Sequence, residues 1–459
     1  MIRLSPSGRA HREPAENPGE RSAQLNVKTT PNWLSSQAGV VQESRSFDSY
    51  GQLQSQQFKV SGASILKITY ERDSLGRITA KNEERPSGIT RFEYGYEPAG
   101  RLVSERKILP DGSSLVTQWS YDGNGNRVME VKPNGTVITG SYDDQDRLLS
   151  YGDYSFSYTA NGELLSKCQG SVCQYFDYDV FGNLRHVILD NGMEIEYVID
   201  GRNRRIGKKI NGTLVQGFIY DDQLRIVAEL DGNNQIVSLF IYADHINVPE
   251  IIEKGGKTYR ILHDHLGSPR FVIDTQTGEI AQELQYDAWG NVVFESNPGF
   301  QPFGFAGGLY DTHTKLTRFG ARDYDPQIGR WTAKDPIGFE GGQSNLFGYA
   351  VADPTNRHDP FGLRCVGPLP LPYANCAEKA KARLSMATLA CEQQYQACLS
   401  NCGCPSIVPS PEAVTCRLLC WLGYQQCLAT AQARHKFDML TCLSLFGPRV
   451  PFPRPMPGK

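Results

Sequence analysis

The stretch FDYDVFGNLR, Phe176–Arg185, contains the unit from which most of the chain is built. Its aromatic residues favour a β-strand, because aromatic and β-branched side chains suit a pleated surface. The Asp-x-x-Gly segment at its centre predicts a tight turn, since glycine readily adopts the positive φ that such turns need. Asn-Leu then begins a second strand. The unit therefore predicts a strand, a turn and another strand.

Related units recur between about residues 60 and 292, for example ITYERDSLGRI, WSYDGNGNRV and LQYDAWGNVV. Their anchor tyrosines, most of them 16 to 26 residues apart, are Tyr70, Tyr96, Tyr121, Tyr142, Tyr158, Tyr178, Tyr197, Tyr220 and Tyr286. Because a single hairpin is only marginally stable in water, neighbouring repeats must pair side by side. The repeats therefore predict a mainly β fold, a long antiparallel sheet that spirals because sheets twist. A β-propeller or sandwich is the alternative, but propeller blades of about 40 residues have twice this period.

Composition divides the chain at Leu363. Ten of the 12 cysteines follow this residue, and residues 364–459 carry a net charge of +6 against −9 for residues 1–363. An acidic body joined to a basic tail suggests two parts with different partners. The basic tail is suited to nucleic acid or another anionic surface, between which the sequence does not choose.

The N-terminal segment and the hydropathy pattern bear on localisation. Residues 1–45 are polar and rich in Pro, Ser and Glu, so they predict a disordered arm. No apolar run reaches the 18 or so residues that a membrane-spanning helix needs. The start of the chain has no apolar stretch of signal-peptide type. We therefore expect synthesis in the cytoplasm without a Sec signal, followed by export or contact-dependent delivery.

Two Asp-Pro-x-Gly motifs lie 24 residues apart, in KDPIGFEG at Lys334–Gly341 and in HDPFGL at His358–Leu363. The motif makes a good β-turn, since Pro fixes φ and Gly takes the left-handed position. The alternative interpretation pairs Asp335 with Asp359 as catalytic groups. Two adjacent carboxylates do not both ionise easily, so one can hold a proton as a general acid while the other activates water. A nearby cation would stabilise the developing oxyanion.

The Tyr-Asp-x-x-Gly units resemble the YD repeats of Rhs proteins. The segment Leu316–Leu363, which begins with LTRFGARDYDPQIGRW, is similar to the repeat-associated core of those proteins. The resemblance covers about residues 60 to 363. It implies a sheet at 46–295 that spirals into a hollow shell, a core at 296–363, and an enclosed C-terminal passenger at 364–459. Relatives include interbacterial toxins, toxin-complex C subunits and teneurins. About ten units make a short shell, which is completed by a partner chain, belongs to a truncated relative, or is a fragment that encloses nothing.

The resemblance also implies a reaction. Rhs-type cores are aspartyl-protease-like units that cut their own chain after the Leu of Asp-Pro-x-Gly-Leu. Carried over to this sequence, the scissile bond is Leu363–Arg364, Asp335 and Asp359 are the carboxylates, and Arg322 is the supporting cation. Arg330 is the rival for that last role. No cofactor and no metal ion are expected.

Eight tail cysteines form a palindrome of spacings, C-x14-C-x6-C-x3-C followed by its mirror image. The mirror pairs are Cys376 with Cys442, Cys391 with Cys427, Cys398 with Cys420, and Cys402 with Cys416. This spacing suits two antiparallel helices joined by disulfides, because within each helix most of the cysteines share a face. Metal binding by these thiols is the alternative. Cys168 and Cys173 flank a predicted turn and are either a cross-strand disulfide or two free thiols.

Together these features predict a toxin carrier whose β-shell cuts itself and frees a basic, Cys-rich helical effector. Its expected partners are the passenger itself, a cognate immunity protein and a delivery apparatus. The alternative is a non-catalytic cell-surface or adhesion scaffold with a disulfide-stapled binding module. An inactive, truncated relic is a third possibility.

Overall fold

The computed structural model describes residues 26–30, 33–243 and 245–365. Its regular structure there is almost entirely β, with three short 3-10 helices, η1 (Phe305–Gly307), η2 (Gly338–Gly341) and η3 (Ala350–Ala352). In the part of the chain that the structure describes, no helix is long and apolar enough to cross a membrane. The helical hairpin and the cysteine pairs predicted after Cys365 lie outside the described residues.

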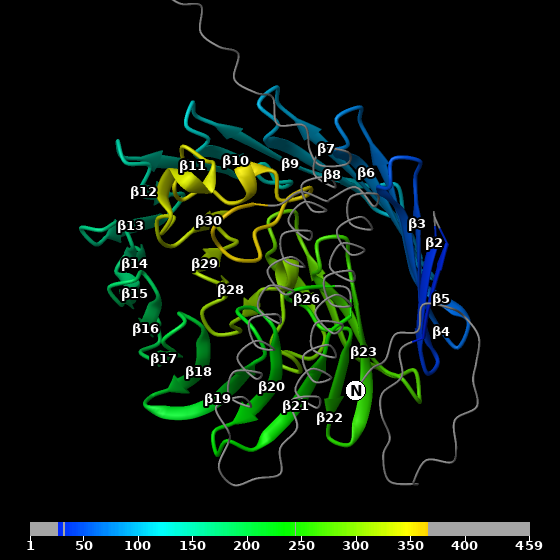
Figure 1. Ribbon diagram of the computed structural model, residues 1–459. Helices are drawn as coiled ribbons and strands as arrows, with labels where there is room; N and C mark the ends of the chain where they lie inside the picture. The colour runs from blue at the N-terminus through cyan, green and yellow to red at the C-terminus, as the bar shows by residue number, and fades with distance from the viewer. Residues whose placement is uncertain (1–25, 31–32, 244, 366–459) are drawn as a thin grey trace, which may run out of the picture. The chain divides into compact units, whose positions relative to one another are not determined.

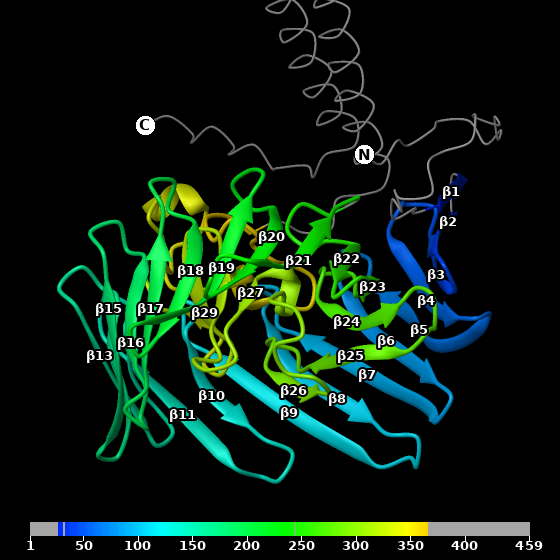
Figure 2. The same cartoon turned by 90° about the horizontal axis from the view of Figure 1, so that it is seen from below.

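One antiparallel sheet contains strands β1 to β26 (Figures 1 and 2). Its first strands are β1 (Asn26–Thr30), β2 (Trp33–Ala38), β3 (Val41–Phe47), β4 (Leu53–Val60), β5 (Ala63–Arg72), β6 (Ile78–Arg85), β7 (Gly88–Tyr96), β8 (Leu102–Ile108), β9 (Ser114–Tyr121), β10 (Arg127–Val131), β11 (Val137–Tyr142), β12 (Leu148–Tyr151) and β13 (Tyr154–Tyr158). The remaining strands are β14 (Leu164–Gln169), β15 (Val172–Tyr178), β16 (Leu184–Ile188), β17 (Glu194–Ile199), β18 (Arg205–Ile210), β19 (Thr213–Tyr220), β20 (Ile226–Asp231), β21 (Ile236–Ile241), β22 (Ile251–Lys254), β23 (Lys257–His263), β24 (Pro269–Asp274), β25 (Ile280–Tyr286) and β26 (Val292–Glu295). The predicted mainly β fold is confirmed.

The turn chemistry of the repeat is visible between β15 and β16. A carboxylate oxygen of Asp179 accepts the backbone N–H groups of Phe181 (2.9 Å) and Asn183 (3.0 Å). Gly182 has φ +79°, which an L-residue rarely adopts. Leu184 then begins β16 fully buried. Asp therefore closes the turn and Leu anchors the following strand.

In several repeats the tyrosine links its unit to the preceding one. The hydroxyl of Tyr121 donates to the backbone carbonyl of Leu102 (2.6 Å), the first residue of β8. Tyr220 does the same to Arg205 (2.8 Å), the first residue of β18. Where the tyrosine makes this bond, the acceptor is the first residue of an earlier strand, so the bond fixes the step between those repeats.

The sheet curls until its first strands lie against its last ones, as the path of the ribbon from blue to green shows in Figure 1. The buried carboxylate of Glu83 in β6 receives two hydrogen bonds, 3.0 and 2.9 Å long, from Arg270 in β24. Val40, beside β3, donates its backbone N–H to the carbonyl of Thr275 at 2.9 Å. Side chains of the two ends also share one apolar cluster, which includes Phe58 and Phe271. We call this meeting of the two ends the seam.

Strands β2 and β3 show that the predicted disordered arm is wrong for residues 33–45, and β1 extends the sheet to Asn26. The polar composition suggested disorder, but in these strands some of the polar residues are buried and hydrogen-bonded. Ser36 and Glu43 are 5% and 2% exposed, and both receive hydrogen bonds from Arg260 on β23. A partner more than 200 residues away is what allows this polar segment to form strands.

Residues 296–363 lie inside the curl (Figures 1 and 2) and carry a second, small sheet. Its strands are β27 (Leu309–Tyr310), β28 (Thr317–Phe319), β29 (Arg322–Asp325) and β30 (Arg330–Trp331). Buried ion pairs hold it to the wall of the main sheet: Asp311 with Lys208 (2.7 Å), Asp323 with Arg205 (2.8 Å) and Asp325 with Lys167 (2.7 Å). These carboxylates therefore have structural roles.

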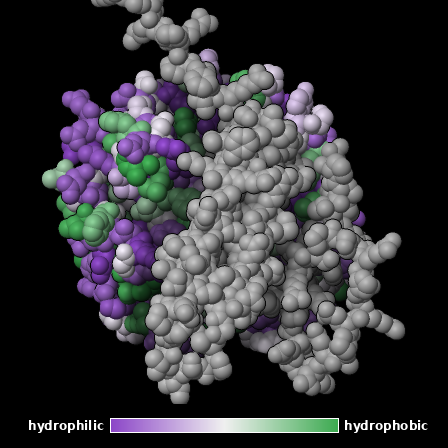
Figure 3. Space-filling model, in the orientation of Figure 1, coloured by the Kyte–Doolittle hydropathy of each residue, from purple (hydrophilic) through white to green (hydrophobic). Residues whose placement is uncertain are grey.

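The outer surface of the sheet is mixed. Where Figure 3 shows it on the left, hydrophilic residues predominate and hydrophobic ones are scattered between them. Val180 and Phe181, at the tip of one turn, are 90% and 70% exposed. Isolated exposed apolar side chains are normal on soluble proteins, so we assign them no role.

Candidate functional site

The two Asp-Pro-x-Gly motifs do form turns of one design. The backbone N–H of Gly338 donates to the carbonyl of Asp335 (2.9 Å), and that of Gly362 donates to the carbonyl of Asp359 (3.2 Å). Both glycines have positive φ, +57° and +64°. A Cβ on Gly362 would lie 2.3 Å from the carbonyl oxygen of Phe319, so only glycine fits against the turn between β28 and β29. The turn interpretation of both motifs is thus correct, whatever further role they have.

Arg322, the first residue of β29, brings the two turns together. Its guanidinium lies 3.0 Å from a carboxylate oxygen of Asp335 and 3.4 Å from one of Asp359. It also donates to the backbone carbonyls of Gly362 (2.6 Å) and Leu346 (3.2 Å). All three charged side chains are at most 7% exposed. We call Asp335 and Asp359 the aspartate pair.

The Leu363–Arg364 peptide bond lies beside this pair. One carboxylate oxygen of Asp359 accepts the backbone N–H groups of Leu363 and Arg364, both at 3.1 Å. The carbonyl oxygen of Leu363 and an oxygen of Asp335 both lie within 3 Å of the point where a Cβ of Gly341 would stand. The Asp359 carboxyl group is therefore hydrogen-bonded at the amide nitrogen of the bond, and that of Asp335 lies no more than about 5.4 Å from its carbonyl oxygen, the sum of the two distances from Gly341.

Burial of the aspartate pair raises the pKa of both carboxyl groups. Burial raises the pKa of Asp335, against the lowering effect of Arg322. Burial likewise raises the pKa of Asp359, although Arg322 and the backbone N–H groups of Leu363 and Arg364 lower it. Burial also lowers the pKa of Arg322 to about 10, so its guanidinium remains charged at neutral pH. Because one cation neutralises one carboxylate, the buried group is neutral when the pair holds a single proton.

The guanidinium of Arg322 is positioned by an aromatic ring as well as by its hydrogen bonds. Its central carbon lies 4.2 Å from the centroid of the Trp331 ring, a cation–π distance. Arg330, the rival for the cation's role, instead donates to the side chain of Asn126 at 2.7 Å and lies over the rings of Tyr142 and Phe347. Among the interactions of the described residues, those of Arg330 do not involve the aspartate pair.

Gly341 is a site residue that the sequence analysis missed. A Cβ there would come 2.5 Å from Asp335 and 2.9 Å from the Leu363 carbonyl oxygen. The absence of a side chain is therefore what lets the carboxyl group approach the peptide bond. The signal available in the sequence was the Gly-Gly pair at 341–342, but glycine pairs are common in turns.

The structure joins Cys168 and Cys173 in a disulfide across β14 and β15, where the two residues are direct cross-strand partners. Of the two states considered for these thiols, the structure contains the disulfide. Cys365, the last described residue, is free.

Comparison with known proteins identifies the family. The model of the teneurin YD-shell family matches residues 20–352, nearly three quarters of the chain. The chain belongs to the teneurin YD-shell family. Its recognition as a YD-repeat shell protein is thereby confirmed, and the aspartate pair lies at the C-terminal end of this YD-shell.

Individual relatives are long proteins of more than one kind. Teneurin-3 of Danio rerio is 30% identical over 306 residues, which cover 64% of this chain and 11% of the relative. Double-stranded DNA deaminase toxin A of Burkholderia cenocepacia is 30% identical over 339 residues, which cover 66% of this chain and 23% of the toxin. A crystal structure of TcdB2-TccC3-TEV covers 72% of this chain and 21% of that one, with 16% identity and a TM-score of 0.44. The YD-shell chain thus spans less than a quarter of the length of these relatives.

Proposed function

We propose that this YD-shell is a carrier that cuts its own chain at Leu363–Arg364 and so separates a basic, Cys-rich C-terminal effector from the shell. The observation that supports the proposal is the placement of the aspartate pair around a shared arginine, with Asp359 hydrogen-bonded at the nitrogen of that bond and Asp335 in the neighbourhood of its carbonyl oxygen. A turn alone does not require two buried aspartates on one guanidinium.

The geometry suggests distinct roles for the two acids. Asp359, next to the amide nitrogen, takes a proton from the attacking water and passes it to that nitrogen as the C–N bond breaks. Asp335, in its acid form, donates a hydrogen bond to the Leu363 carbonyl oxygen and stabilises the charge that develops there. The water oxygen becomes part of the new carboxyl group of Leu363, and Arg364 becomes the new N-terminus. Arg322 contacts both acids, and the backbone N–H groups of Leu363 and Arg364, which donate to Asp359, favour the ionised form of that residue.

The reaction needs no substrate-binding step. The bond is part of the same chain and is already hydrogen-bonded to Asp359, so proximity supplies a large part of the rate. A single turnover releases the product and ends the reaction.

The test is the intact mass of the purified full chain and of its variants. We expect the wild type to give fragments 1–363 and 364–459, and Asp335→Asn and Asp359→Asn to remain whole. Asp353→Asn is the matched control, because Asp353 is also a buried aspartate before a proline but is paired with Arg357 (3.7 Å). This control should be cut like the wild type, and circular dichroism should show that all four chains are folded.

Two results would count against the proposal. Cleavage at Leu363–Arg364 in Asp335→Asn would remove Asp335 from the mechanism. Fragments ending at Asp335 or Asp359 would indicate acid hydrolysis of Asp–Pro bonds, and the fragment masses distinguish these cuts from one after Leu363.

The similarity to a toxin supports the carrier function at a coarser level. Because a DNA deaminase toxin shares the YD-shell, we propose that the released tail acts as an effector that reaches another cell by export or contact-dependent delivery. A cognate immunity protein in the producing cell would then be required. Expression of residues 364–459 in the cytoplasm, and separately with a periplasmic signal, tests toxicity and the compartment in which it acts.

The second candidate is a non-catalytic scaffold of the cell-surface or adhesion type, which the similarity to Teneurin-3 favours. In that case the chain stays whole and the tail remains attached as a binding module. The intact mass distinguishes the two functions, since only the carrier is cut after Leu363.

A further inference from the structure

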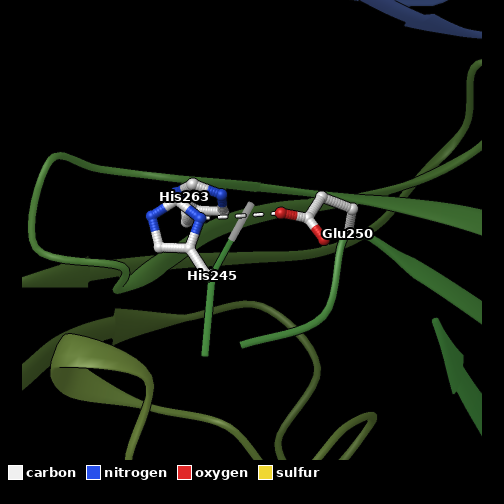
Figure 4. Close-up of side chains that lie close together, drawn as sticks. All are labelled: His245, Glu250 and His263. Atoms are coloured by element: carbon white, nitrogen blue, oxygen red, sulfur yellow. Dashed lines mark ion pairs between the residues drawn. The ribbon is translucent and has the colours of Figure 1, made fainter. Parts of the chain in front are cut away.

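A second cluster of chemically active side chains lies on the main sheet, at the seam. His245 and Glu250 come from the loop between β21 and β22, and His263 is the last residue of β23. One nitrogen or oxygen atom of each lies within 4.8 Å of the others, and Figure 4 shows the two imidazole rings side by side facing the carboxylate. Glu250 and His263 are buried, and His245 is partly exposed.

We propose that His245, Glu250 and His263 form a binding site for a divalent transition metal ion of the Zn²⁺ class. Two imidazoles and one carboxylate are a donor set that such ions prefer, whereas Mg²⁺ and Ca²⁺ prefer oxygen ligands alone. The three residues belong to no standard ligand spacing, so the sequence alone does not predict this site. The proposal is independent of the proposed self-cleavage.

The distances fit a metal site of small radius. Nδ1 of His245 lies 3.5 Å from Oε1 of Glu250, and neighbouring ligands of a tetrahedral Zn²⁺ lie roughly 3.3 Å apart. Nδ1 of His245 is buried and makes no hydrogen bond to any described residue. Its contact with the Glu250 carboxylate, at 3.5 Å, is longer than a good hydrogen bond, and a metal ion between the two atoms would satisfy both. The ligand atoms of all three residues lie within 4.8 Å of one another, so side-chain shifts of up to about 1.5 Å bring the whole set to that spacing.

The surroundings orient the ligands as protein metal sites do. Nδ1 of His263 lies 3.1 Å from the carbonyl oxygen of Asp264. A proton on Nδ1 donates to that carbonyl and leaves the lone pair on Nε2, which is the usual tautomer arrangement of a metal-bound histidine. The second carboxylate oxygen of Glu250 accepts the backbone N–H of Ala243. The first oxygen is thereby directed toward His245.

One neighbour opposes a cation. Nη2 of Arg45, on β3, lies 3.4 Å from Nε2 of His263, while the Nε of Arg45 is bonded to Glu43 at 2.6 Å. Arg260 is also paired with Glu43, at 3.1 Å. The bound ion would therefore displace the end of the Arg45 side chain. Removing the positive charge of Arg45 should therefore strengthen metal binding. If the cluster only stabilised the fold and bound no metal, the same substitution would not change metal binding.

A metal ion here would join three parts of the fold. The loop of His245 and Glu250 would be tied to β23, and β23 is held to β4 by a hydrogen bond from Gln56 to the His263 carbonyl (2.8 Å). The site would thus stabilise the closed seam, and the metal would raise the unfolding temperature because it binds only the folded chain.

The test uses the full chain with its free thiols alkylated, and Co²⁺ as the probe. Co²⁺ bound to nitrogen and oxygen gives visible d–d bands, and Co²⁺ bound to thiolate adds strong near-ultraviolet charge-transfer bands. We expect one Co²⁺ per chain without charge-transfer bands, displacement of Co²⁺ by Zn²⁺, and a higher unfolding temperature with Zn²⁺. His245→Gln and Glu250→Gln should weaken binding about tenfold or more, and Arg45→Gln should strengthen it.

A second histidine–glutamate pair provides the control for metal binding. His186→Gln is the matched variant, because His186 forms a two-residue pair with Glu194 at 3.6 Å but belongs to no such cluster. It should bind Co²⁺ like the parent chain. Binding unchanged in His245→Gln and in Glu250→Gln, or no binding at all by folded parent chain, would overturn the proposal. If His245→Gln fails to fold, Glu250→Gln decides, since glutamine retains an acceptor for Ala243.

Discussion

The buried ion pair at the seam gives the most direct stability prediction. Arg270 and Glu83 are 5% and 7% exposed, and two parallel hydrogen bonds join them. Although burial would raise the pKa of Glu83, Arg270 and then Lys81 hold this pKa well below its ordinary value. Arg270→Met removes the main partner and leaves a buried carboxylate. Breaking such a pair from one side costs about 3–5 kcal/mol.

The penalty should depend on pH. In the wild type the stabilising contribution of Glu83 is present above its unfolded pKa of 4.5 and is lost only as the pH falls toward the lower folded value. In Arg270→Met the folded pKa rises instead, so protonation of Glu83 relieves the penalty near pH 4. The double variant Glu83→Gln/Arg270→Met should recover part of the loss at neutral pH, by about 1–3 kcal/mol of coupling.

Urea unfolding at pH 7.5 and pH 4, followed by tryptophan fluorescence, measures these effects. Trp119 and Trp289 belong to the apolar cluster at the seam, so their emission reports on this region. Arg106→Met is the control, since Arg106 is about half exposed and its pair with Glu93 spans 3.5 Å. It should cost less than about 1 kcal/mol. A similarly small cost for Arg270→Met would refute the claim that this pair holds the two ends of the sheet together.

Three further predictions concern single groups. Burial raises the pKa of Glu105 to about 7, so ionisation of this group destabilises the fold as the pH rises from 4.5 through 7. Glu105→Gln should therefore raise the free energy of unfolding, measured in urea, by about 2–3 kcal/mol at pH 8 and leave it unchanged at pH 4. Gly341→Ala should slow self-cleavage at least about tenfold, because the new Cβ would meet Asp335 and the Leu363 carbonyl oxygen. The control is Gly201→Ala, which has open space around the new Cβ and should be cut at the wild-type rate. A time course of intact mass measures both rates. Burial raises the pKa of both members of the aspartate pair above the ordinary 3.8. The cleavage rate should therefore stay high at pH values where ordinary aspartates have lost their protons, and should fall when the pair loses its last proton. A rate that follows a pKa near 3.8 would contradict this.

Much of the fold could be predicted from local chemistry. Each YD unit contains its own strand, its turn aspartate and its glycine, so FDYDVFGNLR specifies a hairpin with no information from the rest of the chain. The curl of the sheet followed from the general twist of strands. The pairing of Asp335 with Asp359 was also anticipated, because the two motifs are alike.

What the sequence could not give were contacts between distant residues. The partner of Glu43 is Arg260, 217 positions later, so the strands near the N-terminus looked like a polar arm. The choice of Arg322 over Arg330 depends on which arginine faces the turns and not on spacing. The cluster of His245, Glu250 and His263 likewise arises only when a loop folds back on the end of β23.

Refolding in water enriched in oxygen-18 tests whether the aspartate pair hydrolyses Leu363–Arg364. Full-length chain denatured in urea is diluted into this water, and the fragments are weighed over time. We expect one heavy oxygen in the new carboxyl group of Leu363, none in the fragment that begins at Arg364, and an intact chain for Asp335→Asn refolded in parallel. A folded wild-type chain that stays whole, or one that is cut at another bond, would contradict this expectation.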